Sequence, residues 1–583
     1  MEGGPNKSNL DIFLEKISPL LGYFLIFFPF VMSFINVKVT VIYLAAIYVY
    51  FVYKSAATAI QFMIALNRIR TANQINWAKL LKGLGNIDEE LQVLEQDLKE
   101  VKSFRWEDYR QQTKQMYSNL RRADEIMAEN AYLPNLLQQF LFNRLKRKTL
   151  NFLHQEISVL KELQGKDIIK PSELQHIVIV PHVKEPESIL RDTIDHLKDQ
   201  TFNTKQINIV LAAEAADPNG VSVSEKLKEE YKDVFNNIWI TNHVLQADEI
   251  VGKSANMNWA GREVYQKVKD MGWDLKKTTV TSCDADSKLD PQYFAYLTYK
   301  YITTEFGEYK YYTSALIFYN NIWRLPFYAR VKNSSHTIFN TANLVRSDKL
   351  VPFSTYTTSF WVLEQIGFWD PWVTPEDYHL FFKAIFKFND KVSAVPLFLK
   401  TLSDAAEGEG HWATIKNNYL QSRRWAWGIS DDGWVIKNFL KNFSRSSIRS
   451  KYITLHMLFD HIMGLSIAFL VLLGGVLPGF LNPDFNKDTA GALFPIVTGQ
   501  FVQITIFFLI VTIIFDFYLR PTPKDMPWWK NITRVLEWVV QPIAGFILTA
   551  IPGLEAQTRL VFGRYLEYYV TKKKGDGEEE GKS

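Results

Sequence analysis

The chain contains 583 residues (67.7 kDa) with a net charge of +4, a mean hydropathy of −0.10 and one cysteine, Cys283. This length exceeds what one hydrophobic core holds, so two or three structural units are expected. The small net charge, with no basic stretch interleaved with aromatic residues, argues against a nucleic-acid partner, and a single cysteine excludes an intrachain disulfide and any multi-cysteine metal site.

Two apolar stretches lie near the amino terminus. Residues 17–37 carry no charge, and a second stretch runs from Val39 to about Asn67. Each is long enough to cross the roughly 30 Å hydrocarbon layer of a membrane as a helix. Asp11 and Glu15 precede the first stretch and a second span follows it, so the pattern favours two membrane helices over a cleaved signal peptide.

Three further apolar runs lie near the carboxyl terminus, at residues 462–483, 489–515 and 538–554. The first two predict membrane spans. The third is shorter, contains Pro542 and ends near Pro552, which fits either a full span or a re-entrant hairpin.

Basic residues at the ends of these runs predict the orientation of the chain. They follow the second span and precede the third, so the large middle region is expected on the cytoplasmic side of a plasma or inner membrane. Both flanks of the last run are also basic, which favours a re-entrant or interfacial last segment. The residues are Arg68, Arg70, Lys79 and Lys82; Lys437, Lys441, Arg445, Arg449 and Lys451; then Arg520, Lys524, Lys530, Arg534, Arg559, Arg564 and Lys572 to Lys574.

The region from about residue 75 to 170 is polar and rich in helix formers. Apolar residues recur there at helical spacing: Ile87, Leu91, Leu94, Leu98 and Val101. This stripe predicts a helical linker or hairpin that acts as a structural spacer, with a partner-binding coiled coil as the alternative.

After Lys170 the pattern changes to short apolar runs separated by helical stretches. Residues 176–180, 207–212, 238–241 and 278–283 predict buried strands of a largely parallel α/β sheet. Ligands bind such sheets beyond the carboxyl ends of the strands.

Two acidic motifs are the first candidates for chemistry. Asp284 and Asp286 follow a predicted strand, where two carboxylates can approach one Mg²⁺ or Mn²⁺ ion that also takes diphosphate oxygens; a solvated loop is the alternative. Glu376 and Asp377 lie in an aromatic stretch that raises the pKa of a carboxylate toward that of a general base. The sequence from Thr374 to Asp377 also fits a helix start, and both interpretations are compatible.

Polar and aromatic residues form two further candidates. In the run 421–425, Trp425 offers a flat face for a sugar ring and Arg424 a charge for a diphosphate, whereas an interfacial anchor is the alternative. Lys253 begins a stretch in which a lysine can reach phosphate, although a capped helix explains the same residues. Residues 181–185 have polar groups where a nucleotide base would lie.

Taken in order, Asp284/Asp286, Glu376/Asp377 and Gln421/Arg424/Trp425, between membrane spans at both ends, resemble the processive inverting glycosyltransferases of family 2. Cellulose, chitin and hyaluronan synthases belong to that family, whose catalytic domain has the GT-A fold. The resemblance covers about residues 177–436.

The resemblance implies a role for each matching residue. Asp284 and Asp286 would hold the metal and the nucleotide diphosphate, Asp377 would be the general base with Glu376 beside it, and Lys253 would lie in the nucleotide site. Gln421, Arg424 and Trp425 would line the acceptor end, with Arg424 near the diphosphate. Displacement at the anomeric carbon would then invert its configuration without a covalent enzyme intermediate.

Three departures from the family pattern bear on substrate identity. The acidic pair after the second strand is replaced by residues 213–217, in which Glu214 is the substitute for nucleotide binding; Pro375 replaces a threonine before Glu376; and residues 335–346 lack the usual acceptor loop. We therefore name no particular polysaccharide.

These observations predict four regions: a membrane region at 1–70 with two spans, a helical linker at 71–170, a cytoplasmic GT-A catalytic domain at 171–440, and a second membrane region with a charged tail at 441–583. The predicted function is metal-dependent hexosyl transfer, with Mg²⁺ or Mn²⁺, from a nucleotide sugar to a growing polysaccharide in a multi-pass membrane protein surrounded by lipid. Transfer of one sugar to a lipid-linked acceptor is the alternative, and a non-catalytic nucleotide-sugar sensor or export scaffold is a remote one.

Overall fold

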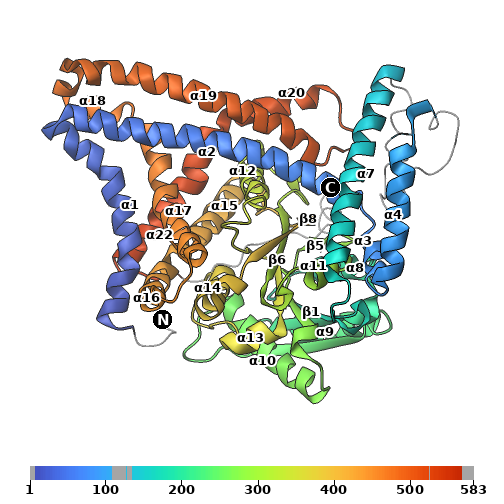
Figure 1. Ribbon diagram of the computed structural model, residues 1–583. Helices are drawn as coiled ribbons and strands as arrows, with labels where there is room; N and C mark the ends of the chain where they lie inside the picture. Colours follow the sequence, from blue (N-terminus) through green and yellow to red (C-terminus); the bar gives the residue numbers. More distant parts are fainter. Residues whose placement is uncertain (1–6, 108–126, 128–133, 524, 567–583) are drawn as a thin grey trace.

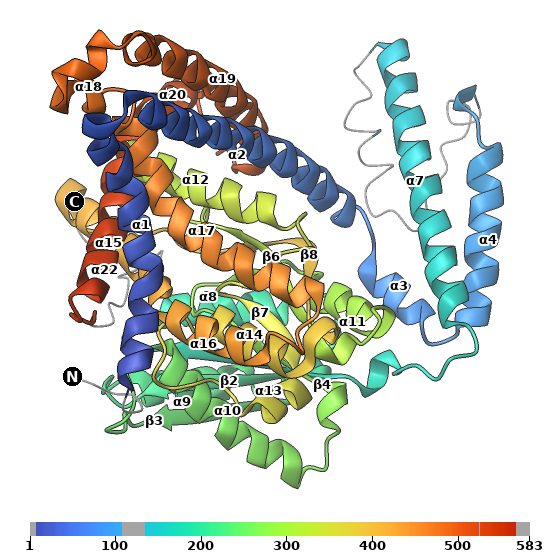
Figure 2. The same cartoon turned by 60° about the vertical axis from the view of Figure 1, so that its left-hand side comes forward.

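A computed structural model describes residues 7–107, 127, 134–523 and 525–566. Of the long apolar helices, α2 (Val37–Ala72) and α19 (Thr489–Leu519) lie side by side across the molecule, while α1 (Asn9–Ile35), α17 (Ile448–Leu473) and α22 (Ile551–Val561) run down from that pair beside the sheet and its covering helices (Figures 1 and 2). A helical hairpin stands to one side. The chain is therefore a mixed α/β protein that also contains a large group of long apolar helices.

An eight-stranded sheet is the centre of the α/β part, in the order β3-β2-β1-β4-β7-β6-β8-β5. Neighbouring strands from β3 to β4 are parallel, while β7 is antiparallel to both β4 and β6, and β5 is antiparallel to β8. The strands are β1 Gln175–His182, β2 Ile207–Glu214, β3 Asn237–His243, β4 Thr278–Ser282, β5 Lys288–Leu289, β6 Tyr311–Ile317, β7 Tyr356–Ser359 and β8 Ala394–Leu402.

The prediction of four buried strands is confirmed, and these four form the parallel half of the sheet. Helical crossovers join them, which is the connection that parallel strands need. The other half mixes both directions, so the sheet as a whole is mixed rather than largely parallel. The helices of this part are α8 Glu187–Lys198, α9 Gly220–Tyr231, α10 Lys253–Asp270, α11 Tyr293–Thr303, α12 Phe327–Asn343, α13 Phe360–Ile366, α14 Glu376–Phe388, α15 Gly410–Ala426 and α16 Asp432–Asn442.

Five helical runs in the described chain are long and apolar enough to cross a membrane. Four are single helices: α1 (Asn9–Ile35), α2, α17 (Ile448–Leu473) and α19. The fifth, Trp529–Val561, joins α20 (Trp529–Leu536), α21 (Gln541–Gly545) and α22 (Ile551–Val561) through short irregular helical turns. Pro542 and Pro552 stand at the starts of α21 and α22, where a missing N–H costs no helical hydrogen bond.

The fifth run has the length of a full span, whereas the basic residues on both flanks favoured a re-entrant or interfacial last segment. The basic tail residues Lys572 to Lys574, used above for orientation, lie outside the described residues. The cytoplasmic orientation of the catalytic region stays a prediction.

A helical hairpin occupies the predicted linker region. Helices α4 (Ile87–Ser103) and α7 (Asn135–Leu163) lie side by side, and α3 (Trp77–Gly83) connects them to the sheet part (Figure 2). Leu91, Leu94 and Val101 from the predicted stripe are buried in this hairpin. The stripe is therefore covered by the same chain.

Candidate functional site

The candidate site lies at the carboxyl end of β4, where α10 and α14 begin. Lys253, the first residue of α10, connects these elements because its Nζ lies 2.7 Å from Asp284 Oδ1 and 2.9 Å from Glu376 Oε1. It also donates a hydrogen bond of 2.9 Å to the carbonyl oxygen of Ser354. The two carboxylates raise the pKa of Lys253 despite its burial, so the side chain is a fixed cation.

The two aspartates that follow β4 point to different partners. Asp284 is partly exposed and contacts Lys253 and the Ser354 hydroxyl. Asp286 is only 2% exposed, and its Oδ2 accepts hydrogen bonds of 2.8 Å from Ser403 Oγ and from the Asp404 backbone N–H. Of the two aspartates, only Asp284 is therefore accessible to a ligand from solvent.

The difference in exposure between Asp284 and Asp286 determines which of them can approach a divalent metal. In the described part of the chain, no three His, Cys, Asp or Glu side chains are grouped as metal ligands. Asp284 has the hard oxygen atoms that Mg²⁺ and Mn²⁺ prefer, and its side chain is 28% exposed. It fits a cation that takes most of its ligands from elsewhere, whereas the protein alone does not form a closed metal site.

Glu376 and Asp377 form the first turn of α14, as the helix-start interpretation predicted. Glu376 is 5% exposed; its Oε2 accepts a 2.8 Å hydrogen bond from Tyr356 OH, which in turn accepts a 2.7 Å bond from Trp369 Nε1. Burial raises the pKa of Glu376 to about 7, and the nearby Lys253 ammonium opposes that rise. Glu376 therefore titrates close to neutral pH.

Asp377 differs from Glu376 in exposure and in partners. Its side chain is partly exposed, and its two oxygens accept 2.9 Å hydrogen bonds from the backbone N–H groups of Ser354 and Tyr378. Burial raises the pKa of Asp377, while these two N–H donors oppose the rise. Asp377 is thus an accessible carboxylate of raised basicity, held in one orientation.

Ser354 joins three of these groups, Lys253, Asp284 and Asp377, and sequence analysis did not find it. Its N–H binds Asp377, its carbonyl oxygen accepts from Lys253, and its hydroxyl donates to Asp284. A left-handed backbone (φ 57°) turns these three groups toward their partners, and such strain in a non-glycine residue is typical of functional sites. A serine between Phe353 and Thr355 carries no sequence signal of this role.

The third motif lies on α15, apart from the two acidic motifs. Gln421 is buried and its Oε1 accepts a 2.9 Å hydrogen bond from Lys332 Nζ of α12. The Trp425 ring is partly exposed and packs on Phe318 and His336, with ring centroids 5.6 Å and 4.9 Å away. The partly exposed Arg424 is near enough to Lys332 for its charge to lower the pKa of that lysine.

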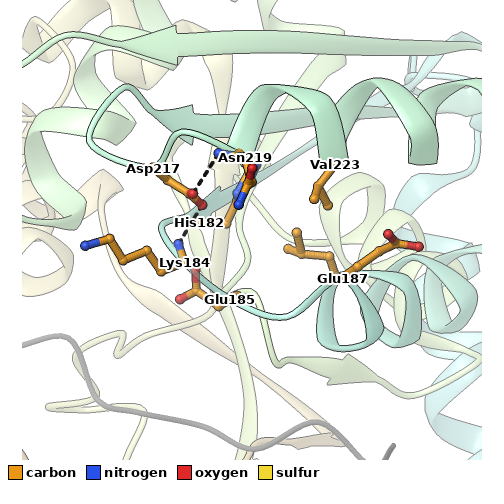
Figure 3. A pocket seen from close by; sticks show the side chains of 9 residues that line it. His182, Lys184, Glu185, Glu187, Asp217, Asn219 and Val223 are labelled. Atoms are coloured by element: carbon orange, nitrogen blue, oxygen red, sulfur yellow. Dashed lines mark hydrogen bonds between the residues drawn. The ribbon is translucent and has the colours of Figure 1, made fainter.

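A pocket of about 310 Å³ opens beside the ends of β1 and β2 (Figure 3). Lys184 and Asp217 meet at its mouth, where the Lys184 N–H donates a 2.8 Å hydrogen bond to Asp217 Oδ2. Asn219 and His182 also line it, so polar groups face an apolar wall that includes Val223. Three residues of the run 181–185, which the sequence analysis assigned to a base-binding surface, line this pocket: His182, Lys184 and Glu185.

Glu214, the residue assigned to nucleotide binding from the sequence, contacts a histidine instead of this pocket. His243 Nδ1 lies 2.9 Å from Glu214 Oε2, and its Nε2 lies 2.8 Å from Glu249. Asp217, three residues further along the same run, lines the pocket together with Glu185 and Glu187. The sequence showed an acid after the second strand, but not which of the two acids of that run, Glu214 or Asp217, lines the pocket.

Comparison with known proteins gives a distant likeness. Neither a protein-family model nor a curated protein matches the chain. Among solved structures, the mannosyltransferase PcManGT from Pyrobaculum calidifontis in complex with GDP-Man and Mn²⁺ is 13% identical, with a TM-score of 0.36 over 60% of this chain and 92% of that one. TarS 1–349 from S. aureus in complex with UDP-GlcNAc is 12% identical, with a TM-score of 0.30 over 67% and 93% of the two chains. At these values the likeness is weak.

Proposed function

We propose that this chain is an inverting glycosyltransferase of the membrane-embedded family 2 type, which moves a sugar from a nucleotide-sugar donor to an acceptor at the membrane. The observation that carries the proposal is the group of Lys253, Asp284, Glu376 and Asp377 around Ser354. It places a charged lysine, Lys253, a partly exposed acid, Asp284, and an oriented base, Asp377, together at the carboxyl end of β4.

Asp377 is the general base in this proposal. An acceptor hydroxyl gives its proton to the Asp377 carboxylate while its oxygen attacks the anomeric carbon, and the bond from that carbon to the diphosphate breaks. Attack from the face opposite the leaving group inverts the configuration. The raised pKa of Asp377 suits proton uptake, and its two backbone hydrogen bonds hold it in position.

Donor binding is assigned to Lys253, Asp284 and the pocket beside the ends of β1 and β2. Lys253 supplies positive charge for the diphosphate, and the pocket lined by Lys184, Asp217 and Asn219 has the size and the polar groups to take a nucleoside. Asp284 is the residue that would approach a bound Mg²⁺ or Mn²⁺ ion, which would stabilise negative charge on the leaving diphosphate. Asp286, buried and hydrogen-bonded, supports the turn that presents Asp284.

The acceptor end is assigned to α15. Trp425 presents part of an aromatic face, which suits stacking with a sugar ring, while Gln421 lies buried behind it. A growing polysaccharide is the acceptor that the motif order favours. Addition of a single sugar to a lipid-linked acceptor is the second candidate, and the small set of five membrane-length helical runs in the described chain favours it.

The test compares the full-length protein with Asp377→Asn on a panel of nucleotide sugars with Mg²⁺ or Mn²⁺. We expect transfer or hydrolysis by the wild type, and a loss of about 100-fold or more in Asp377→Asn, because general-base catalysis contributes on this order. Nucleotide binding by calorimetry should be unchanged. Asp199→Asn, at an exposed site of the same domain, is the matched control.

Three results separate the candidates. Products of many sizes support polymer synthesis, and one added sugar on lipid supports the second candidate, with the assignment of Asp377 intact in both. No turnover by wild-type protein on the whole panel contradicts catalysis and favours a nucleotide-sugar sensor or export scaffold.

A further inference from the structure

A buried lysine lies behind the acceptor motif. Lys332 of α12 is only 2% exposed, and its Nζ is 2.9 Å from Gln421 Oε1 and 4.5 Å from the centroid of the Trp425 ring. Within the described chain, no carboxylate lies within ion-pair distance of this ammonium. One side chain from a neighbouring helix therefore contacts two of the three motif residues on α15.

This arrangement is costly for the fold. Burial lowers the pKa of Lys332 to about 7, and the positive charge of Arg424 acts in the same direction. His336, the other titratable side chain beside Trp425, is held neutral by burial, which lowers its pKa to about 3. An apolar side chain of similar length would fill the same volume without this cost, so packing alone does not account for a lysine here.

Helix α12 is itself firmly anchored. The Arg520 guanidinium at the end of α19 donates a 2.7 Å hydrogen bond to Ser334 Oγ, and Arg330 lies 2.6 Å from Glu537 in the last apolar run. Lys332 stands between these two contact points. Its ammonium is therefore presented to α15 from a helix with little freedom to shift.

We propose that Lys332 is a positioning residue for the acceptor: its hydrogen bond fixes the Gln421 carboxamide and its ammonium fixes the plane of the Trp425 ring. The acceptor sugar then meets a preset stacking surface. This inference rests on the proposed function and adds to it a residue outside the three sequence motifs.

The test separates acceptor handling from donor handling. With the donor that the panel identifies, and the free disaccharide of the donated sugar as the acceptor probe, Lys332→Met should raise the acceptor KM about tenfold or more, the effect of losing a hydrogen bond to a charged group. Donor affinity and transfer of the sugar to water should stay within about twofold. Lys332→Arg, which keeps a cation and its donors, should recover part of the loss.

Lys310 provides a matched control. It directly precedes β6 and is also buried, at 7% exposure, and its Nζ donates to the carbonyl oxygen of Lys391, which lies shortly before β8. Lys310→Met should lower thermal stability while leaving the acceptor KM unchanged. Equal acceptor KM values for wild type and Lys332→Met would overturn the proposal.

A second measurement decides the matter even if the wild type proves inactive, in which case the proposed function fails separately. In thermal unfolding of the full chain, the Tm changes of Lys332→Met and Trp425→Leu should not add up to the change in the double variant, because contacting residues are coupled. The pair Lys310→Met and Trp425→Leu should be additive. Additive losses for the Lys332 pair would show that the lysine does not hold the ring.

Discussion

Replacing Lys253 by methionine tests the electrostatics of the candidate site. The ammonium lies 2.9 Å from Glu376 and 2.7 Å from Asp284, and it opposes the rise in the pKa of Glu376. Breaking a buried ion pair costs about 3 to 5 kcal/mol, and 1.36 kcal/mol corresponds to one pH unit in a pKa. We therefore expect the pKa of Glu376 to rise from about 7 to roughly 9 in Lys253→Met.

The sign of the pH effect follows from proton uptake. An unfolded glutamate has a pKa near 4.5, so above neutral pH the folded variant holds a proton that its unfolded state has lost. Stability then falls as pH rises. Wild-type Glu376 is largely ionised above pH 8 and has almost no such slope. The stability gap between the two proteins should thus widen by about 2 kcal/mol from pH 7 to pH 9.

The assay is thermal unfolding of the full chain in detergent at pH 7, 8 and 9. For a chain of this length, a widening of about 2 kcal/mol corresponds to roughly 2 °C in the difference between the two Tm values. Lys253→Arg retains the charge and should show little widening, and adding Glu376→Gln to Lys253→Met should remove it. A Tm gap that stays constant across these pH values, or that widens equally in the double variant, would refute the coupling of Lys253 to Glu376.

Two further substitutions test neighbouring contacts. Tyr356→Phe leaves the buried Trp369 Nε1 without its acceptor and Glu376 without its donor, so we expect a loss of about 2 kcal/mol, measured as a lower Tm, together with a higher pKa of Glu376. Asp284→Asn removes the one accessible carboxylate of the aspartate pair; transfer that EDTA abolishes in the wild type should need about tenfold more Mn²⁺ in this variant. Equal Mn²⁺ requirements would contradict the role of Asp284.

The half of the sheet with strong hydrophobic signals was predictable. Strands β1 and β2 contain continuous apolar runs because both faces of the parallel half of the sheet are buried there. Strand β7 escaped notice because its buried face consists of threonines, such as Thr357, whose hydroxyl bonds with that of Thr281 at 2.8 Å. A strand that satisfies its polar side chains across the sheet has no apolar pattern to detect.

The sequence predicted the candidate site only where residues of the recognised motifs contact one another through their side chains. Asp284, Glu376 and Lys253 are brought together, and α14 begins at Glu376 as expected. Ser354 was missed because its contribution is a left-handed backbone with an N–H and a carbonyl group, which every residue type carries. Lys332 was missed because its partners, Gln421 and Trp425, are about 90 residues away in the chain and adjacent only after α12 and α15 pack.

In the proposed function, the residues that bind the donor and those that bind the acceptor are carried by different parts of the fold. Lys253 and Asp284 are held by α10 and the end of β4, whereas α15 packs on α22 and is fastened to it by Arg423, 2.6 Å from Glu555. Helix α12, on the other side of the motif, is tied to α19 through Arg520 and Ser334. In the proposed function, a shift of α19 or α22 would therefore move Trp425 directly, whereas Lys253 and Asp284 are carried by α10 and the end of β4. Changes in lipid thickness should accordingly alter the acceptor KM before they alter donor affinity, because α12 and α15 contact membrane-length helices directly.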